Sequence, residues 1–232
     1  MTAGSGVQRR HDCCAIVHSD VVEDYLQAVF VLTGRGTVVG TSTLAAYLGV
    51  SSPAVSVMLK RLTVAGLVSR PSRHVELTAH GLRHALGVVR RHRLLESFLA
   101  EVLAVPWDEV HAESGKLEHA VSDRLMNRID AVLQHPTRDP HGDPIPRALG
   151  GHDERWAASL AVTEPGCRFR VDRVSDEDGG ALRYLARLGI RPGVVVDVDG
   201  RDPFGGPVWV RVGGSRQPLG PALADLVHGT TT

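Results

Sequence analysis

The chain has 232 residues, of which 43% are hydrophobic, 22% charged and 4% aromatic, and its formal net charge at pH 7 is zero. This composition is ordinary for a soluble globular protein, and the length suffices for two compact domains or for one domain with smaller units. No run approaches the roughly 18 consecutive apolar residues of a membrane-spanning helix, so we expect no membrane partner.

The N-terminal segment, residues 1–18, carries arginines and the adjacent Cys13 and Cys14 but no long apolar stretch. We therefore expect no signal peptide and interpret the segment as a disordered tail. Because the three cysteines of the chain make a poor disulfide framework, we expect a cytoplasmic protein in a reducing compartment. A soft-metal site that also uses His11 and His18 is a weaker alternative, since adjacent cysteines seldom chelate one ion.

The next segments predict a DNA-binding unit. Apolar residues at helical spacing after Asp20 predict a helix over residues 20–33. Residues 41–66 then fit a helix-turn-helix, because Gly49 lies in the turn, where a left-handed backbone conformation favours glycine. Residues 67–78 predict two short strands joined by a turn, in the position of a wing.

The exposed face of this unit has the side chains that DNA binding needs. Small polar and apolar side chains on the second helix would let it enter the major groove, and basic residues of the hairpin would contact phosphates. The residues predicted to contact DNA are Ser51, Ser52, Pro53, Ala54, Ser56, Lys60, Arg70 and Arg73. The alternative is an αα-hairpin in which Gly49 only caps a helix. The basic block over residues 60–93 favours DNA binding.

The rest of the chain changes from helices to strands. Helical periodicity predicts one long helix over residues 79–103 and a further helix over residues 108–133. The segment 134–151 is rich in Pro, Gly and Asp and predicts a linker, in which histidines such as His141 are expected at the surface. Strand alternation beyond it, with one short helix, predicts a small β-barrel. The sequence thus predicts a mostly α fold with a C-terminal β unit.

Histidines and glutamates on the two predicted long helices have metal-binding spacing. His92 and Glu96 are four residues apart, so an imidazole and a carboxylate can hold one cation from one helix face. His111, Glu118 and His119 lie on the next predicted helix. This mixture of donors is expected for Mn²⁺, Fe²⁺, Co²⁺ or Zn²⁺. Glu/His pairs are also common on ordinary helix surfaces, which is the alternative reading.

Several longer segments occur together in a specific order. They are "EDYLQAVFVL", "SSPAVSVMLKRL", "AGLV", "LTAHG", "VRRHRLLESFL", "WDEVHAESGKLEHAVSDRL" and "DPHGDPIP". In them the chain resembles, along almost its whole length, the diphtheria-toxin-repressor family of metal-dependent transcription regulators, on the manganese-regulator side. The resemblance implies a winged helix-turn-helix domain at 19–84, a helical metal-binding and dimerisation domain at 85–150 and an SH3-like (FeoA-like) domain at 160–229. It also implies a homodimer that a divalent cation activates to bind a palindromic operator, usually repressing genes of metal-ion homeostasis.

The resemblance assigns metal ligands by position. The residues that match the family's primary site are Asp24, Glu118 and His119, and those that match its ancillary site are His92, Glu96, His111 and Asp178. Gly115 falls where iron-type members carry Cys and manganese-type members carry Glu, so we expect a weakened or altered primary site. Asp24, where the family can carry Met, favours a hard, oxygen-preferring ion, Mn²⁺, over softer ions. Fe²⁺ is the alternative, and Zn²⁺, Co²⁺ and Ni²⁺ are further ions that could bind in vitro.

Three alternative functions remain beside a manganese-dependent repressor. One is an iron-dependent repressor of the same family, and another is a winged-helix regulator with weakened metal control, of which Gly115 would be the first sign. The third is a metal hydrolase that uses His92, Glu96, His111 and His119. It is disfavoured because no acid is left in an obvious general-base position, so we predict a regulator and not an enzyme.

Overall fold

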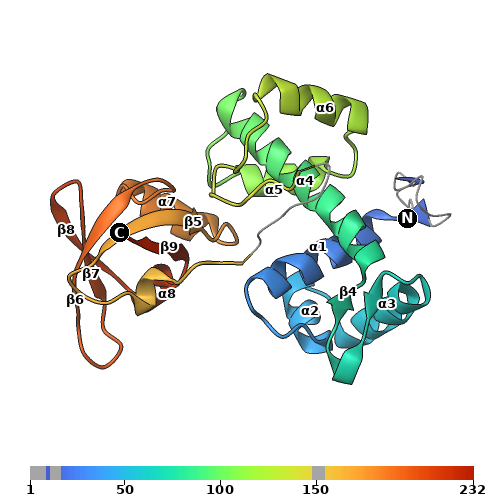
Figure 1. Ribbon diagram of the computed structural model, residues 1–232, viewed down its shortest axis with the longest axis horizontal. Helices are drawn as coiled ribbons and strands as arrows, with labels where there is room; N and C mark the ends of the chain where they lie inside the picture. Colours follow the sequence, from blue (N-terminus) through green and yellow to red (C-terminus); the bar gives the residue numbers. More distant parts are fainter. Residues whose placement is uncertain (1–8, 11–16, 148–154) are drawn as a thin grey trace. The chain divides into compact units, whose positions relative to one another are not determined.

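The protein is described here by a computed structural model, which covers residues 9–10, 17–147 and 155–232 (Figure 1). Its chain forms two compact units. The first unit comprises the chain up to His92, Lys116–Met126 and Pro146–Arg155, and the second comprises Arg93–Gly115, Asn127–Ile145 and Trp156–Thr232. The chain passes between the units at several points, the first of which lies inside α4 (Ala79–Glu101), between His92 and Arg93.

The N-terminal segment differs in part from the disordered tail that the sequence predicts. The structure describes β1 (Arg9–Arg10) and β2 (Val17–His18), whose backbones pair as a short antiparallel ladder. The prediction of disorder therefore does not hold for these four residues. The other candidate ligands of a soft-metal site, His11, Cys13 and Cys14, lie outside the described residues.

A helix-turn-helix forms the centre of the first unit, as predicted. The helices of this unit that precede α4 are α1 (Asp20–Gly34), α2 (Thr41–Leu48) and α3 (Ser52–Val64). Gly49 ends α2 with a φ of 65°, a left-handed conformation that costs glycine little. Ser51 begins α3, because its side chain accepts a hydrogen bond from the backbone N–H of Ala54. No single helix among the described residues is long and apolar enough to cross a membrane, although α2 and α3 taken together pass on length and composition.

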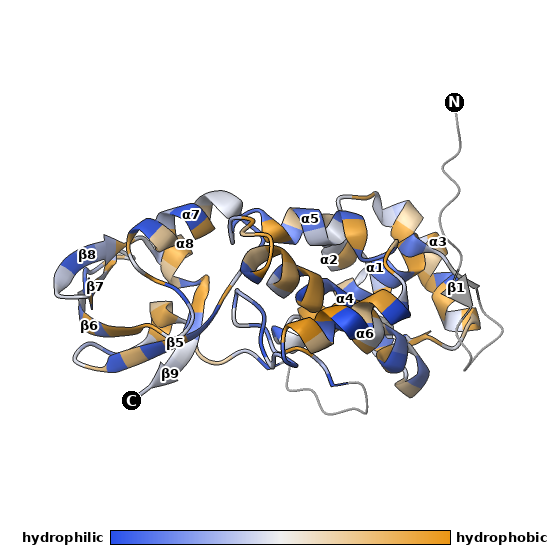
Figure 2. Ribbon diagram, turned by 90° about the horizontal axis from the view of Figure 1, so that it is seen from above, coloured by the Kyte–Doolittle hydropathy of each residue, from blue (hydrophilic) through white to orange (hydrophobic). Residues whose placement is uncertain are grey.

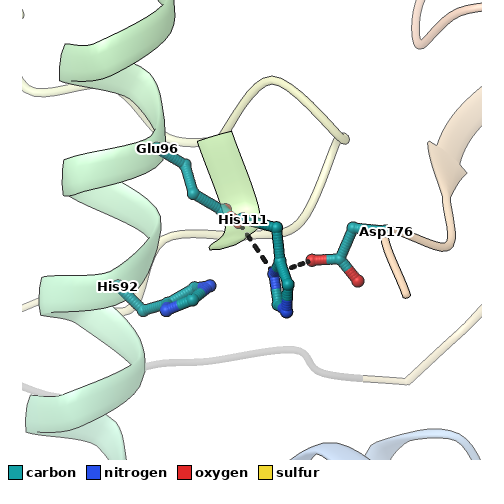
Figure 3. Close-up of side chains that lie close together, drawn as sticks. All are labelled: His92, Glu96, His111 and Asp176. Atoms are coloured by element: carbon teal, nitrogen blue, oxygen red, sulfur yellow. Dashed lines mark hydrogen bonds and ion pairs between the residues drawn. The ribbon is translucent and has the colours of Figure 1, made fainter. Parts of the chain in front are cut away.

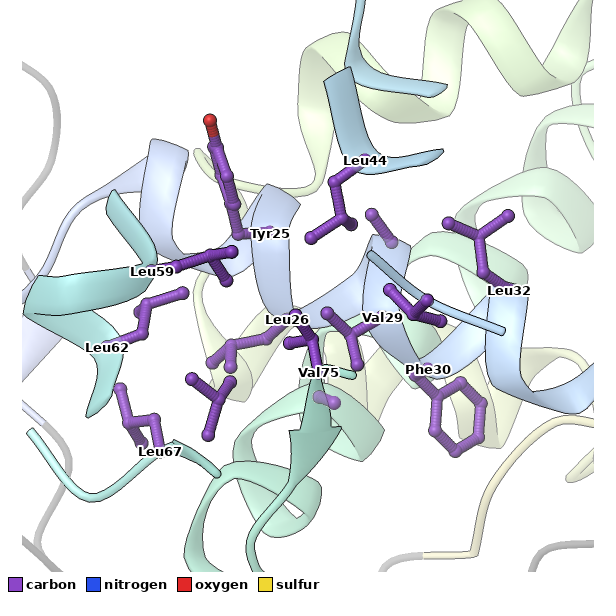
Figure 4. Close-up of a cluster of buried hydrophobic side chains, with 14 of the residues drawn as sticks. Tyr25, Leu26, Val29, Phe30, Leu32, Leu44, Leu59, Leu62, Leu67 and Val75 are labelled. Carbon is purple, nitrogen blue, oxygen red and sulfur yellow. The ribbon is translucent and has the colours of Figure 1, made fainter. Parts of the chain in front are cut away.

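The hydrophobic core of the first unit is built around α1 (Figure 4). Leu26 and Val29 of this helix are fully buried, and Leu44 of α2 and Leu59 of α3 belong to the same cluster. Burying one such side chain contributes roughly 2 kcal/mol to folding. The core therefore holds α3 at a fixed angle to α1 and leaves its opposite face exposed.

The predicted wing follows α3. Strands β3 (Val68–Ser69) and β4 (Glu76–Leu77) pair antiparallel, with Val68 opposite Leu77. A 3-10 turn, η1 (Pro71–Arg73), connects them, and within it Ser72 has a φ of 49°. The hairpin predicted from the sequence is thus confirmed.

The cap at Ser51 gives a first testable prediction. Replacing Ser51 with Ala removes the hydrogen bond to Ala54 N–H, so we expect the free energy of unfolding to fall by about 1 kcal/mol. The measurement is urea unfolding followed by circular dichroism. Ser52→Ala is the matched control, since Ser52 is an exposed residue inside the helix and is expected to be nearly neutral. Equal effects of the two changes would contradict the assigned cap.

The single helix predicted over residues 108–133 is instead two helices. α5 (Val110–Leu117) ends in a turn, and α6 (Asp123–Val132) begins after Ser122. The Ser122 hydroxyl accepts a hydrogen bond from Leu125 N–H, which is the bond of a helix N-cap. This local cap competes with the apolar periodicity that runs across it. Glu118 and His119 consequently lie in the turn between the helices and not on one continuous helix face.

Helix α6 has apolar side chains that the described part of the chain leaves exposed. Hydrophobic and hydrophilic residues alternate along it in Figure 2. Ile129 is buried, whereas Leu125 is 48% and Val132 is 61% exposed. Exposed aliphatic side chains on an amphipathic helix are typical of a protein–protein interface.

The C-terminal part of the second unit is a five-stranded antiparallel barrel with order β8-β7-β6-β5-β9. Its elements are η2 (Leu160–Val162), β5 (Arg168–Val174), α7 (Gly179–Arg187), β6 (Val195–Arg201), β7 (Val208–Val212), β8 (Ser215–Leu219), α8 (Pro221–Ala224) and β9 (Val227–Thr231). Alternate residues of the strands point inward, and Phe169, Val196 and Val210 are buried in its core. The predicted small β-barrel is confirmed.

The linker between α6 and the barrel is docked onto strand β5 within the second unit. The backbone N–H of Val174 donates to His141 O, and Arg173 Nε lies 2.9 Å from Asp143 Oδ1. Gly142 has a φ of 89°, and a Cβ placed there would come within 2.1 Å of Asp172 O. A side chain at this position is therefore excluded by both conformation and space. Residues 139–146, the central part of the segment that the sequence predicts as a linker, are therefore buried or half-buried.

Candidate metal centres

The first unit brings together Asp24, Glu118 and His119, whose ligand atoms all lie within 4.8 Å of one another. Asp24 comes from α1, and the other two come from the turn after α5. His119 Nε2 lies 2.9 Å from Asp24 Oδ1 and 3.4 Å from Glu118 Oε1. These are the three residues that the family resemblance assigns to the primary site. Two carboxylates and one imidazole fit a divalent cation of the Mn²⁺ to Zn²⁺ series.

Two further residues, which the sequence reasoning missed, orient this group. Glu23 is 3% exposed, and its Oε2 lies 2.8 Å both from His119 Nδ1 and from Arg91 Nη2. A carboxylate on Nδ1 fixes the imidazole and leaves Nε2 to face Asp24, the arrangement found behind many metal-bound histidines. The only sequence signal for Glu23 is that it directly precedes a candidate ligand.

The charges of this group depend on one another. Burial would lower the pKa of His119, but its hydrogen bonds to Asp24 and Glu23 and the charge of Glu118 raise it to about 10. Burial would likewise raise the pKa of Glu23, but its hydrogen bond with His119 and the charge of Arg91 lower it to about 2. Without a cation, the group is therefore held together by an imidazolium ion among carboxylates.

This protonation predicts how cation binding depends on pH. A histidine binds a metal ion in its neutral form, so binding at the first group must release the proton of His119. Because the pKa of His119 is raised to about 10, the proton is present throughout the neutral range. We therefore expect the apparent Mn²⁺ affinity to rise by up to about tenfold for each pH unit between about pH 6 and about pH 8. Calorimetry across this range is the check, and a flat profile would contradict the expectation.

Replacing Glu23 with Gln tests its orienting role. The amide keeps the size of the side chain but loses the charge that holds the Nδ1 proton of His119, so we expect Mn²⁺ to bind about tenfold more weakly. Isothermal titration calorimetry measures the change. Glu109→Gln, at an exposed position before α5, is the control for the lost charge. An affinity equal to that of the unaltered protein would show that Glu23 does not orient the site.

Gly115 lies in α5 and contributes no side-chain ligand to this group. It is exposed, and a Cβ added there would meet no other atom within 4 Å. The position therefore has room for a longer side chain. The packing around position 115 would permit a side chain, so the absence of one is a choice of this sequence.

A second group contains His92, Glu96, His111 and Asp176 (Figure 3). His111 Nδ1 lies 3.1 Å from Glu96 Oε1 and 2.9 Å from Asp176 Oδ2. His92 precedes Glu96 by one turn of α4, and its own Nδ1 lies 2.8 Å from Glu118 Oε2. Burial would raise the pKa of Asp176, but the hydrogen bond with His111 lowers it. Three of the four members match the predicted ancillary set.

The acid from the barrel is not the one that the sequence predicts. Asp178 caps α7, because its Oδ1 accepts hydrogen bonds from the backbone N–H groups of Gly180 and Ala181. Asp176, two residues earlier, instead reaches His111. The structure thus brings Asp176, and not Asp178, into the second candidate group. The N-cap preference of an aspartate before a helix is the signal that would have separated the two.

A third group, formed by Glu96, Asp139 and His141, was missed by the sequence reasoning. His141 is fully buried, which corrects the prediction of a surface histidine, and its Nε2 donates to Trp107 O at 2.7 Å. Its Nδ1 lies 3.8 Å from Glu96 Oε2. Glu96 thus takes part in both the second and the third group. The local pattern of the segment "DPHGDPIP" predicts a turn-rich linker and gives no sign that Asp139 and His141 are buried in the tertiary structure.

The members of the third group also shift one another's pKa values. Burial and the charges of Asp143 and Glu96 raise the pKa of Asp139 well above its usual value. Burial would lower the pKa of His141, but its interactions with Glu96 and the charges of Asp176 and Asp139 raise it to about 10. These buried carboxylates and the histidine hold protons. A divalent cation that binds to them can replace those protons.

The predicted DNA-contact residues lie on the free face of α3 and on the wing. Ser56 is half-buried, whereas the other positions are exposed: Ser51, Ser52, Pro53, Ala54, Lys60 and Arg70. Arg73 ends the turn of the wing, and its side chain lies outside the described residues. Arg61 is also exposed on α3 and was not among the predicted contacts. The exposed face thus combines small side chains with basic ones, which suits entry into a DNA groove.

Comparisons with known proteins agree with this architecture. Residues 18–75 match the family described as the iron dependent repressor, N-terminal DNA binding domain. Residues 78–147 match the iron dependent repressor, metal binding and dimerisation domain, and residues 158–230 match the FeoA domain.

Individual relatives cover nearly the whole chain. The chain is 39% identical over 221 residues to the iron-dependent repressor IdeR of Mycobacterium tuberculosis, covering 90% of this chain and 96% of that protein. It is 36% identical over 220 residues to the diphtheria toxin repressor of Corynebacterium glutamicum, covering 90% and 94%. Among solved structures it is similar to a manganese-dependent transcriptional repressor in complex with manganese, with a TM-score of 0.86 and 41% identity over 91% of this chain and 100% of that chain. The chain therefore belongs to the diphtheria-toxin-repressor family of metal-dependent transcriptional repressors.

Proposed function

We propose that this protein is a homodimeric repressor that Mn²⁺ activates to bind a palindromic operator, and that its targets are genes of metal-ion homeostasis. The observation that carries the proposal is the convergence of Asp24 with Glu118 and His119. Asp24 belongs to the first helix of the DNA-binding fold, and the other two belong to the turn after α5. A cation held by all three would connect these two segments.

The donor set supports a hard or borderline cation. The first and second groups, which correspond to the predicted primary and ancillary sites, contain carboxylates and imidazoles and no thiolate. Oxygen-rich sets of this kind suit Mn²⁺ better than softer ions. A solved neighbour is named as manganese-dependent, which is consistent with this choice. Fe²⁺ is the second candidate, because the similar curated proteins include repressors named as iron-dependent.

Activation is proposed to act through linkage between metal binding and DNA binding. A bound cation supplies the positive charge that holds Asp24 next to Glu118 and His119. The arrangement that binds DNA must hold the cation more tightly than other arrangements do, because otherwise the cation would shift no equilibrium. Asp24 lies on α1, and residues of α1 and α3 pack in the same hydrophobic core. A cation that holds Asp24 would therefore also hold α3. We propose that the second and third groups bind further cations. These cations would stabilise the contact between the linker and β5 of the barrel.

Dimerisation would place two such DNA-binding units on one operator. The exposed apolar residues of α6, Leu125 and Val132, are proposed to face a second copy of the chain. Two copies related by a two-fold axis present two recognition helices, which matches a palindromic sequence. The domain limits at 19–84, 85–150 and 160–229 are proposed as the functional division of the chain.

The identity of the metal is tested by operator binding in Mn²⁺, Fe²⁺ and Zn²⁺ separately. Affinity for protein sites generally rises from Mn²⁺ through Fe²⁺ to later metals, so affinity for the ion does not identify the activator. The informative quantity is the maximal increase in DNA affinity at saturating metal. We expect the largest increase with Mn²⁺. A larger increase with Fe²⁺, under anaerobic conditions, would favour the iron-dependent alternative.

A further inference from the structure

A basic pocket within the second unit lies between α7 and the loop that precedes α5. It has a volume of about 440 Å³. Its lining includes Trp107, Asp108, Arg183, Arg187 and Arg191. Arg183 and Arg187 lie one turn apart on α7, and Arg191 follows the end of this helix. None of these residues belongs to the three candidate metal groups.

The pocket carries an excess of positive charge. Arg183 Nη1 lies 2.8 Å from Asp108 Oδ2, so these two charges compensate each other. In the part of the chain that the structure describes, neither Arg187 nor Arg191 forms an ion pair with a carboxylate. The pocket lining therefore has three guanidinium groups and one carboxylate. An anion would be attracted to it.

The two arginines without a carboxylate are held in place by aromatic rings. The Arg187 guanidinium lies over the ring of Tyr184 at 5.3 Å, and that of Arg191 lies over the ring of Trp107 at 4.4 Å. Stacking uses the face of the guanidinium and leaves the N–H donors at its edge for a planar fork of hydrogen bonds to an oxyanion. These side chains therefore lose little conformational entropy when they bind a ligand.

Trp107 forms a rigid part of the lining. It is 7% exposed and also stacks against His141, with ring centroids 5.6 Å apart. Its indole N–H is buried and has no acceptor among the described residues. The volume falls within the roughly 300–1,000 Å³ of small-molecule sites. Shape and charge thus favour a small ligand rich in acceptor oxygens.

We propose that this pocket binds a small phosphate-bearing anion with at least two negative charges. Arg187 and Arg191 supply the main donors, and Arg183 adds a third guanidinium that Asp108 keeps oriented. A concave pocket of this size favours a small anion over the extended backbone of a nucleic acid. The arginines that supply the donors belong to none of the candidate metal groups, whereas Trp107 contacts His141 of the third group.

The test is calorimetric titration of the metal-free full-length protein with inorganic pyrophosphate. We expect saturable binding that weakens at least tenfold in the double variant Arg187→Gln with Arg191→Gln. The matched control is Arg168→Gln with Arg216→Gln, which removes the same charge from barrel positions that pair with Asp197 and Asp199. This control should bind pyrophosphate as the unaltered protein does. If the double variant is unstable, Arg187→Gln alone is used instead. It keeps the stacking of Arg191 on Trp107 and should weaken pyrophosphate binding severalfold.

Two further measurements, one with ATP and one with duplex DNA, identify the source of the phosphate. ATP should compete with pyrophosphate, whereas a random-sequence DNA duplex should bind the Arg187/Arg191 double variant and the control equally. Absence of pyrophosphate binding at millimolar concentration, or equal binding by the double variant and the control, would overturn the proposal. So would a loss confined to duplex DNA, since it would mean that these arginines contact a nucleic-acid backbone.

Discussion

Replacing Asp24 with Ala is expected to abolish the stimulation of DNA binding by Mn²⁺ while leaving the protein folded. The carboxylate is the contribution of α1 to the first metal group, and its Oδ1 lies 2.9 Å from His119 Nε2. Without it a cation would touch only the turn after α5, and its binding would no longer depend on the position of α1. We expect the increase in operator affinity at saturating Mn²⁺ to fall from at least about 100-fold to less than about twofold, a loss of roughly 2–3 kcal/mol of coupling.

Stability and a neighbouring acid provide the controls for this change. The Asp24 side chain is 44% exposed, so its removal leaves no large cavity, and we expect the urea midpoint to change little. Asp20→Ala removes a carboxylate from the first turn of the same helix and should leave the Mn²⁺ response intact. Full stimulation of DNA binding in Asp24→Ala would show that the linkage runs through other residues.

Replacing Gly115 with Glu is expected to strengthen Mn²⁺ binding. The family resemblance places a ligand at this position, and a Cβ there would meet no other atom within 4 Å. A third carboxylate would join Asp24 and Glu118 around the cation. We expect Mn²⁺ affinity to rise by about tenfold to 100-fold, which corresponds to roughly 1.4–2.7 kcal/mol.

The control for Gly115→Glu separates ligation from helix stability. Replacing glycine inside α5 with a good helix former such as Glu or Gln is expected to stabilise the helix by roughly 0.5 kcal/mol. Gly115→Gln supplies this effect without a carboxylate, so it should raise the unfolding midpoint without a tenfold gain in Mn²⁺ affinity. Equal affinities of the Glu and Gln variants would show that position 115 does not face the cation.

Local signals in the sequence predicted the DNA-binding fold well. Gly49 marks the turn because it adopts a left-handed conformation, and serine at 51 or 52 is a typical start of a helix, a role that Ser51 takes in the structure. Both signals act over four residues or fewer, so they can be recognised without knowledge of the tertiary structure. The same reasoning missed the cap at Ser122, because the apolar periodicity of the surrounding residues continues across it.

The ligand sets were predicted only where one helix or the family resemblance placed them. His92 and Glu96 follow from helical spacing, whereas Asp24 and His119 are 95 residues apart and were matched by resemblance. Asp176 follows β5, and Asp139 and His141 come from the linker that docks on this strand, so only the tertiary structure brings them to their groups. That docking depends on long-range packing, including the close approach of Gly142 to Asp172, which no local pattern encodes.

The alternative of a regulator with weakened metal control differs from the proposed repressor in one measurable property. In both cases cations bind to groups of carboxylates and imidazoles. Only in the proposed repressor does binding change the affinity for DNA. The absent side chain at Gly115 reduces the number of ligands in the first group but does not remove the connection between α1 and the turn after α5.

The most direct test is the coupling between Mn²⁺ and DNA, measured in both directions on the full-length protein. The DNA is a duplex selected by the protein from a random-sequence library. Fluorescence anisotropy gives the DNA affinity with and without Mn²⁺, and calorimetry gives the Mn²⁺ affinity with and without DNA. Linkage requires the two ratios to be equal, and we expect both to be at least about 100-fold in the unaltered protein. A DNA affinity that is the same with and without bound Mn²⁺ would contradict the proposed function.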